Sequence, residues 1–258
     1  MILIDSHCHL YLPEFQHDIS EVMVRAKNSG VEKFFLPNID SSTADAMLSL
    51  VNQYPDECYP MIGLHPTSVK ENYRNELEFV QKELKKGIYK AVGEIGIDLY
   101  WDRSFLDEQK LVFEKQITWA KEFSLPVVIH ARESFNEIFE IVDRLNDEDL
   151  TGIFHCFTGN IDEARHIISY SGFKLGIGGV VTFKNGGLDK FLKKIPIEYL
   201  VLETDSPYLA PVPYRGKRNE SAYLVQILQK LVEIYGLTPE EVSSATTRNS
   251  LEIFKMTQ

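Results

Sequence analysis

Residues 2–9 read Ile-Leu-Ile-Asp-Ser-His-Cys-His, a short apolar strand that runs directly into two histidines, His7 and His9. Successive side chains of an extended strand alternate between its two faces, so both imidazoles leave the backbone on the same side. Imidazole is the commonest metal ligand in proteins, and the pair is therefore half of a possible metal site. Two histidines also fall close together by chance, so the ends of later strands must decide between these interpretations.

Seven further apolar, β-branched segments follow along the chain and predict strands. They span residues 34–36, 59–64, 91–97, 127–129, 153–157, 175–177 and 200–202. Helical periodicity lies between several of them, as in residues 19–26, which Gly30 is expected to terminate, and in residues 106–120. Thr238-Pro239-Glu240-Glu241 predicts the start of a last helix through a capping box. This alternation predicts parallel β/α units that close into an α/β TIM (β/α)8 barrel.

Length and composition agree with one such barrel over residues 1–258. Hydrophobic residues make up 44% of the chain and charged residues 25%, as in ordinary globular proteins. The apolar runs are too short for a membrane span, and the N-terminus lacks the features of a signal peptide. The three cysteines (Cys8, Cys58 and Cys156) form no CxxC pair. We therefore expect a cytoplasmic protein without a disulfide framework, a membrane partner or an obligate protein partner.

The formal net charge of −11 bears on nucleic-acid binding. It disfavours a protein that coats nucleic acid through a broad basic surface, because such binding depends on neutralising many phosphates. An enzyme that binds a few phosphates in one cleft remains compatible with this charge. Metal-binding carboxylates would also add negative charge that bound cations cancel.

Ionisable residues gather where the predicted strands end, and the active sites of TIM barrels lie at that end. Five of the seven histidines are among them. The residues, in strand order, are His7 and His9, His65, Glu94 and Asp98, His130, His155, and Glu203 and Asp205. Histidines without a common role would rarely gather in this way, so the clustering predicts a metal site.

The order of the strands suggests how the ligands divide between two cations. His7 and His9 would share one cation with Asp205, because strands 1 and 8 are neighbours in a closed barrel. His130 and His155 would hold the second cation, and Glu94 would bridge the two. Two divalent ions about 3.5–4 Å apart activate a shared water and stabilise a developing oxyanion.

Glu94 and Asp205 are accordingly the candidate catalytic residues. Asp205 is placed to orient the water and take its proton. The alternative for both carboxylates is a structural one, as helix caps or ion-pair partners.

Six motifs in this order resemble the TatD family of metal-dependent hydrolases, a branch of the amidohydrolase-like TIM barrels. They are SHCHL (6–10), GLHP (63–66), GEIGID (93–98), VIHAR (128–132), HCFTG (155–159) and ETDSPYLAP (203–211), and PYRGKRNE (213–220) continues the pattern. The resemblance implies a dinuclear site at the positions above and a deoxyribonuclease activity, often exonucleolytic on single strands. Ser221 departs from the family, which commonly has proline there, and this puts the stiffness of the loop in doubt.

Basic and histidine side chains near the same strand ends are candidates for substrate binding. They are His65, Arg132, Arg215, Lys217 and Arg218, and arginine suits bidentate phosphate contacts. The alternatives are a packed histidine at His65, a surface ion pair at Arg132 and a solvated loop for the basic turn.

Other residues have supporting roles in this hypothesis. Glu203 and Asp98 are expected behind the metal ligands, where carboxylates orient them, although Asp98 could also contact substrate. Tyr100, Trp101 and Tyr208 could stack on unpaired bases or pack in the core. Cys8 and Cys156 are expected to point toward the helices as inert thiols.

Three functions compete on this basis. The first is a metal-dependent phosphodiesterase that acts on DNA, with single strands as substrate. The second is a carbonyl-directed metallohydrolase, either a D-aminoacyl-tRNA deacylase or a small-molecule amidohydrolase, because activated water attacks phosphorus or carbon alike. The third, a binding protein with a structural metal, fits poorly because structural zinc sites are usually cysteine-rich. Four imidazoles suit Zn, Ni, Mn or Fe, whereas the resemblance implies Mg or Mn.

Overall fold

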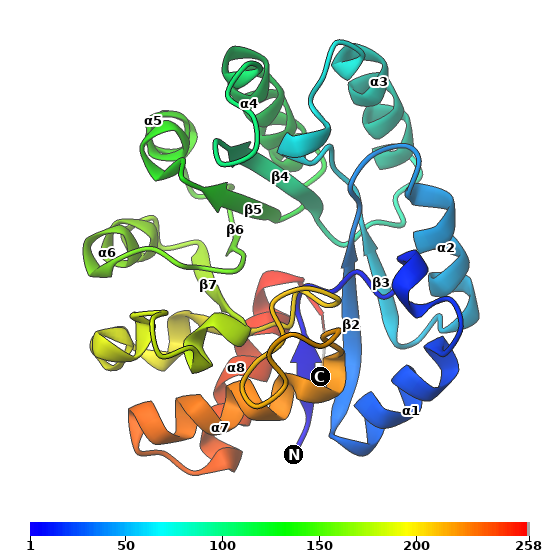
Figure 1. Ribbon diagram of the computed structural model, residues 1–258. Coiled ribbons are helices and arrows are strands. Elements are labelled where there is room, and N and C mark those ends of the chain that lie inside the picture. The colour runs from blue at the N-terminus through cyan, green and yellow to red at the C-terminus, as the bar shows by residue number, and fades with distance from the viewer. Residues whose placement is uncertain (257–258) are drawn as a thin grey trace.

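Residues 1–256 are described by a computed structural model, in which parallel strands are ringed by helices (Figure 1). The strands are β1 (Leu3–Asp5), β2 (Val31–Pro37), β3 (Cys58–Met61), β4 (Val92–Asp98), β5 (Val127–Arg132), β6 (Gly152–Phe154), β7 (Phe173–Ile177) and β8 (Leu200–Leu202). All eight predicted strands are present, and the predicted α/β barrel architecture is confirmed.

The barrel consists of two ladders, β1-β2-β3 and β4-β5-β6-β7-β8, which meet at two seams. At the first seam, Ile62 N–H donates to the carbonyl of Ala91 (3.1 Å) and Gly93 N–H donates to the carbonyl of Ile62 (2.9 Å). At the second, Ser6 N–H donates to the carbonyl of Leu202 (3.0 Å). A few backbone hydrogen bonds rather than regular ladders therefore join β3 to β4 and β8 to β1.

The helices cover the outside of the strands and carry their own sequence signals. They are α1 (Ile19–Asn28), α2 (Ala44–Gln53), α3 (Tyr73–Leu84), α4 (Leu106–Glu122), α5 (Phe135–Leu145), α6 (Ile161–Ser169), α7 (Leu224–Tyr235) and α8 (Pro239–Ile253). Gly30, at φ +88°, follows the end of α1, and Thr238 caps α8 in a complete capping box with Glu241, as predicted. Short 3-10 turns, instead of an α-helix, connect β7 to β8.

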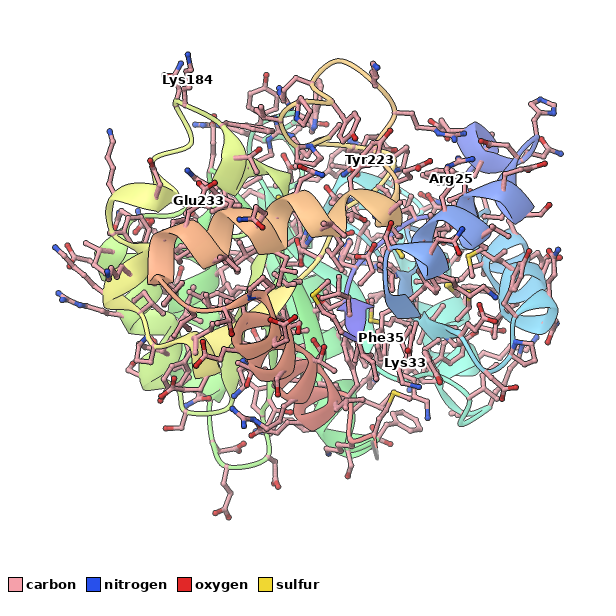
Figure 2. All side chains as sticks on the ribbon, turned by 90° about the horizontal axis from the view of Figure 1, so that it is seen from below. Arg25, Lys33, Phe35, Lys184, Tyr223 and Glu233 are labelled. Atoms are coloured by element: carbon pink, nitrogen blue, oxygen red, sulfur yellow. The ribbon has the colours of Figure 1, made fainter. Side chains whose placement is uncertain are left out.

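Apolar side chains fill the inside of the barrel below the strand ends. They come from most of the strands, and the end of α8 closes them off from solvent; Phe35 of β2 stacks on Phe254 with 3.6 Å between ring centroids. In Figure 2, which labels Phe35, α8 (red) lies in the lower half, and the loops with Lys184 and after β8 rise at the upper edge. The packed lower end leaves the upper, carboxyl end of the strands for the site.

Within residues 1–256, no helix combines the length and the apolar character needed to cross a bilayer.

Candidate metal centre

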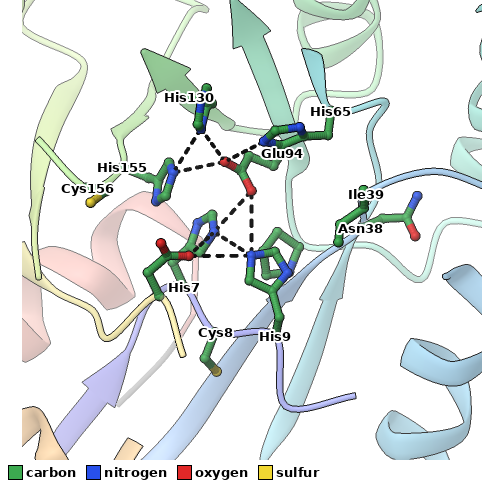
Figure 3. A network of polar contacts seen from close by, with 12 residues as sticks. His7, Cys8, His9, Asn38, Ile39, His65, Glu94, His130, His155 and Cys156 are labelled. Carbon is green, nitrogen blue, oxygen red and sulfur yellow. Dashed lines mark hydrogen bonds and ion pairs between the residues drawn. The ribbon is translucent and has the colours of Figure 1, made fainter. Parts of the chain in front are cut away.

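Glu94, buried on β4, lies at the middle of the site, and each of its oxygens faces a different group of histidines (Figure 3). Its Oε2 lies 3.2 Å from His7 Nε2 and 3.7 Å from His9 Nε2. Its Oε1 lies 2.9 Å from His130 Nδ1 and 2.9 Å from His155 Nε2. The carboxylate thus links two ligand sets that come from opposite sides of the barrel.

The first set is completed by Asp205, which follows β8. Its Oδ1 lies 3.6 Å from His7 Nε2 and 3.5 Å from His9 Nε2, and these two nitrogens are 3.3 Å apart. Asp205 N–H also donates to the carbonyl of His7 (2.9 Å), so the seam between β8 and β1 brings the three side chains together.

The second set is backed by the two carboxylates expected there. Asp98 Oδ2 lies 2.9 Å from His130 Nε2, and Glu203 Oε1 lies 3.3 Å from His155 Nδ1. Each imidazole therefore has one nitrogen against a buried carboxylate and its other nitrogen directed at Glu94. This arrangement orients metal-ligating histidines in proteins and increases their basicity.

The histidines keep the two central carboxylates ionised. Burial raises the pKa of Glu94, but the neighbouring His155, His65 and His7 outweigh it and hold that pKa well below its usual range. Burial also raises the pKa of Asp205, and its hydrogen bond with His9 together with the charges of the histidines lowers it below the usual value. Both carboxylates are therefore available as anionic ligands at neutral pH.

The histidines differ among themselves in their protonation. Burial lowers the pKa of His7 and of His65, which favours neutral rings. Burial opposes charge at His155 and His130 as well, but nearby carboxylates outweigh it. Glu94 and Glu203 raise the pKa of His155, and Asp98 and Glu94 raise the pKa of His130. Without a metal, the raised pKa values favour protons on His130 and His155, whose charge offsets that of the carboxylates, and a bound cation would replace those protons.

His65 lies closer to the centre than its assignment to substrate binding suggested. Its Nε2 is 3.3 Å from Glu94 Oε1, and its Nδ1 accepts the backbone N–H of Thr67 (3.1 Å). Since Nδ1 is an acceptor, the ring proton is on Nε2. This tautomer makes His65 a hydrogen-bond donor toward the site rather than a lone-pair ligand.

A cavity of about 980 Å³ opens above the metal centre. Arg132, Arg215 and Lys217 line it, together with His65. Within residues 1–256, none of the three cationic side chains has a carboxylate partner within ion-pair distance. The cavity therefore combines an anionic metal-binding floor with cationic groups in its wall.

Arg218 differs from the other predicted substrate residues, because the structure turns it away from the cavity. Its two Nη atoms donate to the two carboxylate oxygens of Asp18 at 2.7 Å, and its guanidinium lies over the ring of Phe15, 4.6 Å from the centroid. This side chain fastens the loop after β8 to the start of α1.

Cys156 also differs from its expected orientation toward the helices. It lines the cavity, because the chain leaves β6 through a positive φ of 44° at this residue and strand alternation no longer holds. Burial raises the pKa of Cys156 well above its usual value, which keeps the thiol protonated. Cys8 is fully buried as expected, with Sγ 3.7 Å from the carbonyl of Phe35.

Two supporting residues, Tyr11 and Asp5, were missed by the sequence analysis. The Tyr11 hydroxyl lies 3.0 Å from His9 Nδ1 and donates to the carbonyl of Pro37. Asp5 is fully buried and accepts hydrogen bonds from Thr204 Oγ1 and Ser221 Oγ, each at 2.6 Å. Its position two residues before the first histidine was the available signal.

Ser221 therefore has a contact that a proline could not make. Its hydroxyl ties the loop after β8 to the buried Asp5, beside Asn219, whose amide donates to the carbonyls of Thr204 and Tyr208 at 2.7 Å each. Burial raises the pKa of Asp5 to about 6, in spite of these hydrogen bonds. The loop that carries Asp205 is thus held by side-chain hydrogen bonds, which answers the doubt about its stiffness.

The donor set fits divalent cations. Imidazole nitrogens and carboxylate oxygens converge from separate strands with only 3–4 Å between them. His7, His9 and Glu94 form one compact group of possible ligands. Such electron-rich atoms repel one another unless protons or cations lie between them. A barrel with such a centre at the carboxyl ends of its strands is typical of metal-dependent hydrolases, and we assign the protein to this class.

The comparisons with known proteins agree with this class. Residues 4–255 match the family model described as TatD related DNase, and the chain belongs to the TatD family. It is 37% identical over 256 residues, 99% of this chain and 100% of the relative, to YabD of Bacillus subtilis, an uncharacterized metal-dependent hydrolase.

Two further relatives connect the family to an activity and to a solved structure. A protein of Pectobacterium parmentieri named 3'-5' ssDNA/RNA exonuclease TatD is 29% identical over 260 residues, 98% of this chain and 100% of the relative. The crystal structure of YjjV, a TatD homologue of Escherichia coli, superposes with a TM-score of 0.93 at 28% identity and covers 99% of this chain and 98% of its own.

Proposed function

We propose that the chain is one domain that hydrolyses phosphodiester bonds in single-stranded DNA, removing nucleotides stepwise from an end. The observation that carries this proposal is Glu94, whose two oxygens face two histidine sets beneath a cavity with Arg132 and Arg215 in its wall. A relative named as a 3'-5' ssDNA/RNA exonuclease supports the same substrate and reaction. Three free cysteines suit a reducing cytoplasm as the place of action.

Two divalent cations are the cofactors of this proposal. One would be held by His7, His9 and Asp205, the other by His130 and His155, with Glu94 between them. When bound, such cations supply Lewis-acid activation of a water and positive charge at the scissile phosphate. Zn, Mn, Mg and Ni all remain candidates, since imidazole favours the transition metals and phosphate substrates favour Mg or Mn.

The chain's own residues bind the phosphate and move the proton. Arg132 and Arg215 offer forked N–H donors to phosphate oxygens, Lys217 adds a point charge, and the N–H of His65 points into the site. Asp205 orients the attacking water and accepts its proton as the water oxygen bonds to phosphorus. The P–O3′ bond breaks, and the departing O3′ takes a proton from solvent. The low pKa of Asp205 keeps it unprotonated and ready for this step.

The test uses chelator-stripped protein and a single-stranded oligonucleotide labelled at its 5′ end, with Mg²⁺, Mn²⁺ or Zn²⁺ added back separately. We expect stepwise shortening from the 3′ end with at least one metal. Glu94→Gln should reduce the rate by at least about a hundredfold, because loss of even an outer partner of a ligand typically costs 10–100-fold.

Glu140→Gln is the matched control, since Glu140 pairs with Lys110 on the surface outside the site. Its rate should equal that of the wild type. Internal cleavage would overturn the exonucleolytic part of the proposal. Absence of cleavage with every metal, together with rapid deacylation of D-aminoacyl-tRNA, would overturn the phosphodiesterase in favour of the carbonyl-directed hydrolase.

A further inference from the structure

An exposed tryptophan stands at the mouth of the cavity, in the loop that follows β4. The side chain of Trp101 is 69% exposed and the neighbouring Tyr100 is 52% exposed, whereas the only other tryptophan, Trp119, is 5% exposed on α4. Trp101 lines the same cavity as Arg132 and the metal centre. Burying this ring against a ligand would remove a large apolar surface from water.

Hydrogen bonds fix the backbone of Trp101, although its side chain is largely exposed. Asp98 Oδ1 accepts the N–H of Tyr100 (3.0 Å) and the N–H of Trp101 (3.2 Å). The other oxygen of Asp98 bonds to His130, a member of the metal centre. Lys70 then holds Asp102 at 2.8 Å on the far side of the loop. One carboxylate therefore holds the backbone that carries the indole and also contacts a histidine of the metal centre.

Arg132 completes a platform with the two aromatic rings. Its guanidinium lies 3.9 Å from the ring centroid of Tyr100 and 5.6 Å from that of Trp101, while the two rings meet edge to face at 5.0 Å. The guanidinium of Arg132 covers the ring of Tyr100. Its N–H groups form no ion pair with a carboxylate among the described residues, so they are available to a phosphate. Trp101 is left as the exposed stacking surface.

Resting on the proposed action on nucleic acid, we propose that Trp101 is a stacking site for one unpaired nucleobase of the substrate, with Arg132 bound to the adjoining phosphate. A base must leave its duplex to offer a face to the indole, so this site selects single strands. Aromatic stacking also tolerates any base, which suits an enzyme that degrades strands of mixed sequence. An open groove continues past Arg132 toward Lys190 and offers room for the rest of the strand.

Binding is measured on the full-length chain in chelator, without hydrolysis, through tryptophan fluorescence. The probes are a short oligothymidylate, an oligouridylate, an abasic strand of equal length and a DNA duplex. We expect both base-bearing single strands to quench the emission and bind tightly, and the abasic strand and the duplex to bind more weakly without quenching. DNA and RNA are distinguished by the ratio of the first two affinities.

Trp101→Ala should weaken oligothymidylate binding by roughly tenfold or more, since stacking contributes about 1–3 kcal/mol per base. Trp101→Phe should restore part of the affinity. Leu111→Ala, an exposed apolar change on α4, and Trp119→Phe should bind like the wild type. Equal affinity of wild type and Trp101→Ala, or of base-bearing and abasic strands, would overturn the stacking site.

The two proposals fail separately. A chain that binds bases through Trp101 but cleaves no phosphodiester retains the stacking site and overturns the proposed function. A chain that shortens DNA in a Glu94-dependent manner but binds abasic strands equally well overturns the stacking site alone.

Discussion

At the scale of single residues, Tyr11 controls which nitrogen of His9 faces the centre. Its hydroxyl donates to the carbonyl of Pro37 and therefore accepts a hydrogen bond from the Nδ1–H of His9. A proton on Nδ1 leaves the lone pair on Nε2, the atom that points toward Glu94 and Asp205. Tyr11 thus acts on the ligand set through the tautomer of one histidine.

Replacement of Tyr11 tests this role. Tyr11→Phe should weaken binding of Zn²⁺ by about 10–100-fold in calorimetric titration, because His9 loses the partner that fixes its tautomer. Tyr89→Phe is the control: it also removes a buried tyrosine hydroxyl, which bonds to Glu83 far from the site. Equal Zn²⁺ affinity of the two variants would show that Tyr11 does not position His9.

At the scale of elements, β4 carries the central carboxylate and packs closely against β5. Gly96 pairs with His130 at φ +144°, and a Cβ atom there would lie 2.0 Å from the His130 carbonyl oxygen. Only glycine permits this approach, which sets the distance between Glu94 and His130. The spacing of the two ligand-bearing strands therefore depends on a residue without a side chain.

Gly96→Ala should lower the free energy of unfolding by more than about 3 kcal/mol, since it combines an overpacked contact with an unfavourable φ. The measurement is a urea titration followed by circular dichroism. Gly87→Ala separates the two effects, because Gly87 has φ +68° but no atom within 4 Å of the added Cβ. That variant should lose only about 1–2 kcal/mol. Equal losses would exclude the close contact as the cause.

At the scale of the whole molecule, the metal centre couples proton binding to stability. Raised pKa values at His130 and His155 mean that the folded, metal-free protein holds protons there that the unfolded chain releases at lower pH. That contribution to stability is present below the usual histidine pKa and is lost as the pH rises through the raised values. A cation must displace the same protons, so metal binding tightens with rising pH.

The increase in Tm caused by Zn²⁺ should therefore be larger at about pH 8 than at about pH 6. Thermal unfolding with and without the metal at both pH values measures it. His7 and His65 have lowered pKa values and require no proton release, so they do not change this sign. A Zn²⁺-induced increase in Tm that becomes smaller as the pH rises would contradict the protonation of His130 and His155 in the metal-free protein.

Periodicity and strand ends in the sequence predicted the barrel and the residues at its carboxyl end. Within a strand, side chains alternate between two faces, and this alternation directs Glu94 of β4 and His130 of β5 into the barrel end where they were expected. His7 and His9 follow the end of β1 and reach the same place. Beyond the strand ends this regularity is lost. Asp205 and Cys156 lie in turns with φ of 56° and 44°, and their directions depend on the turns rather than on alternation.

Alternation along the chain thus determined by itself the fold class and the set of residues at one end of the barrel. Tertiary structure alone decided how those residues meet: Glu94 facing two histidine sets, Arg218 bound to Asp18 across 200 positions of sequence, and Tyr11 behind His9. The physical reason is the separation along the sequence of the residues that interact. Strand and helix periodicities are local, whereas these contacts depend on the closure of the barrel and on where its loops cross.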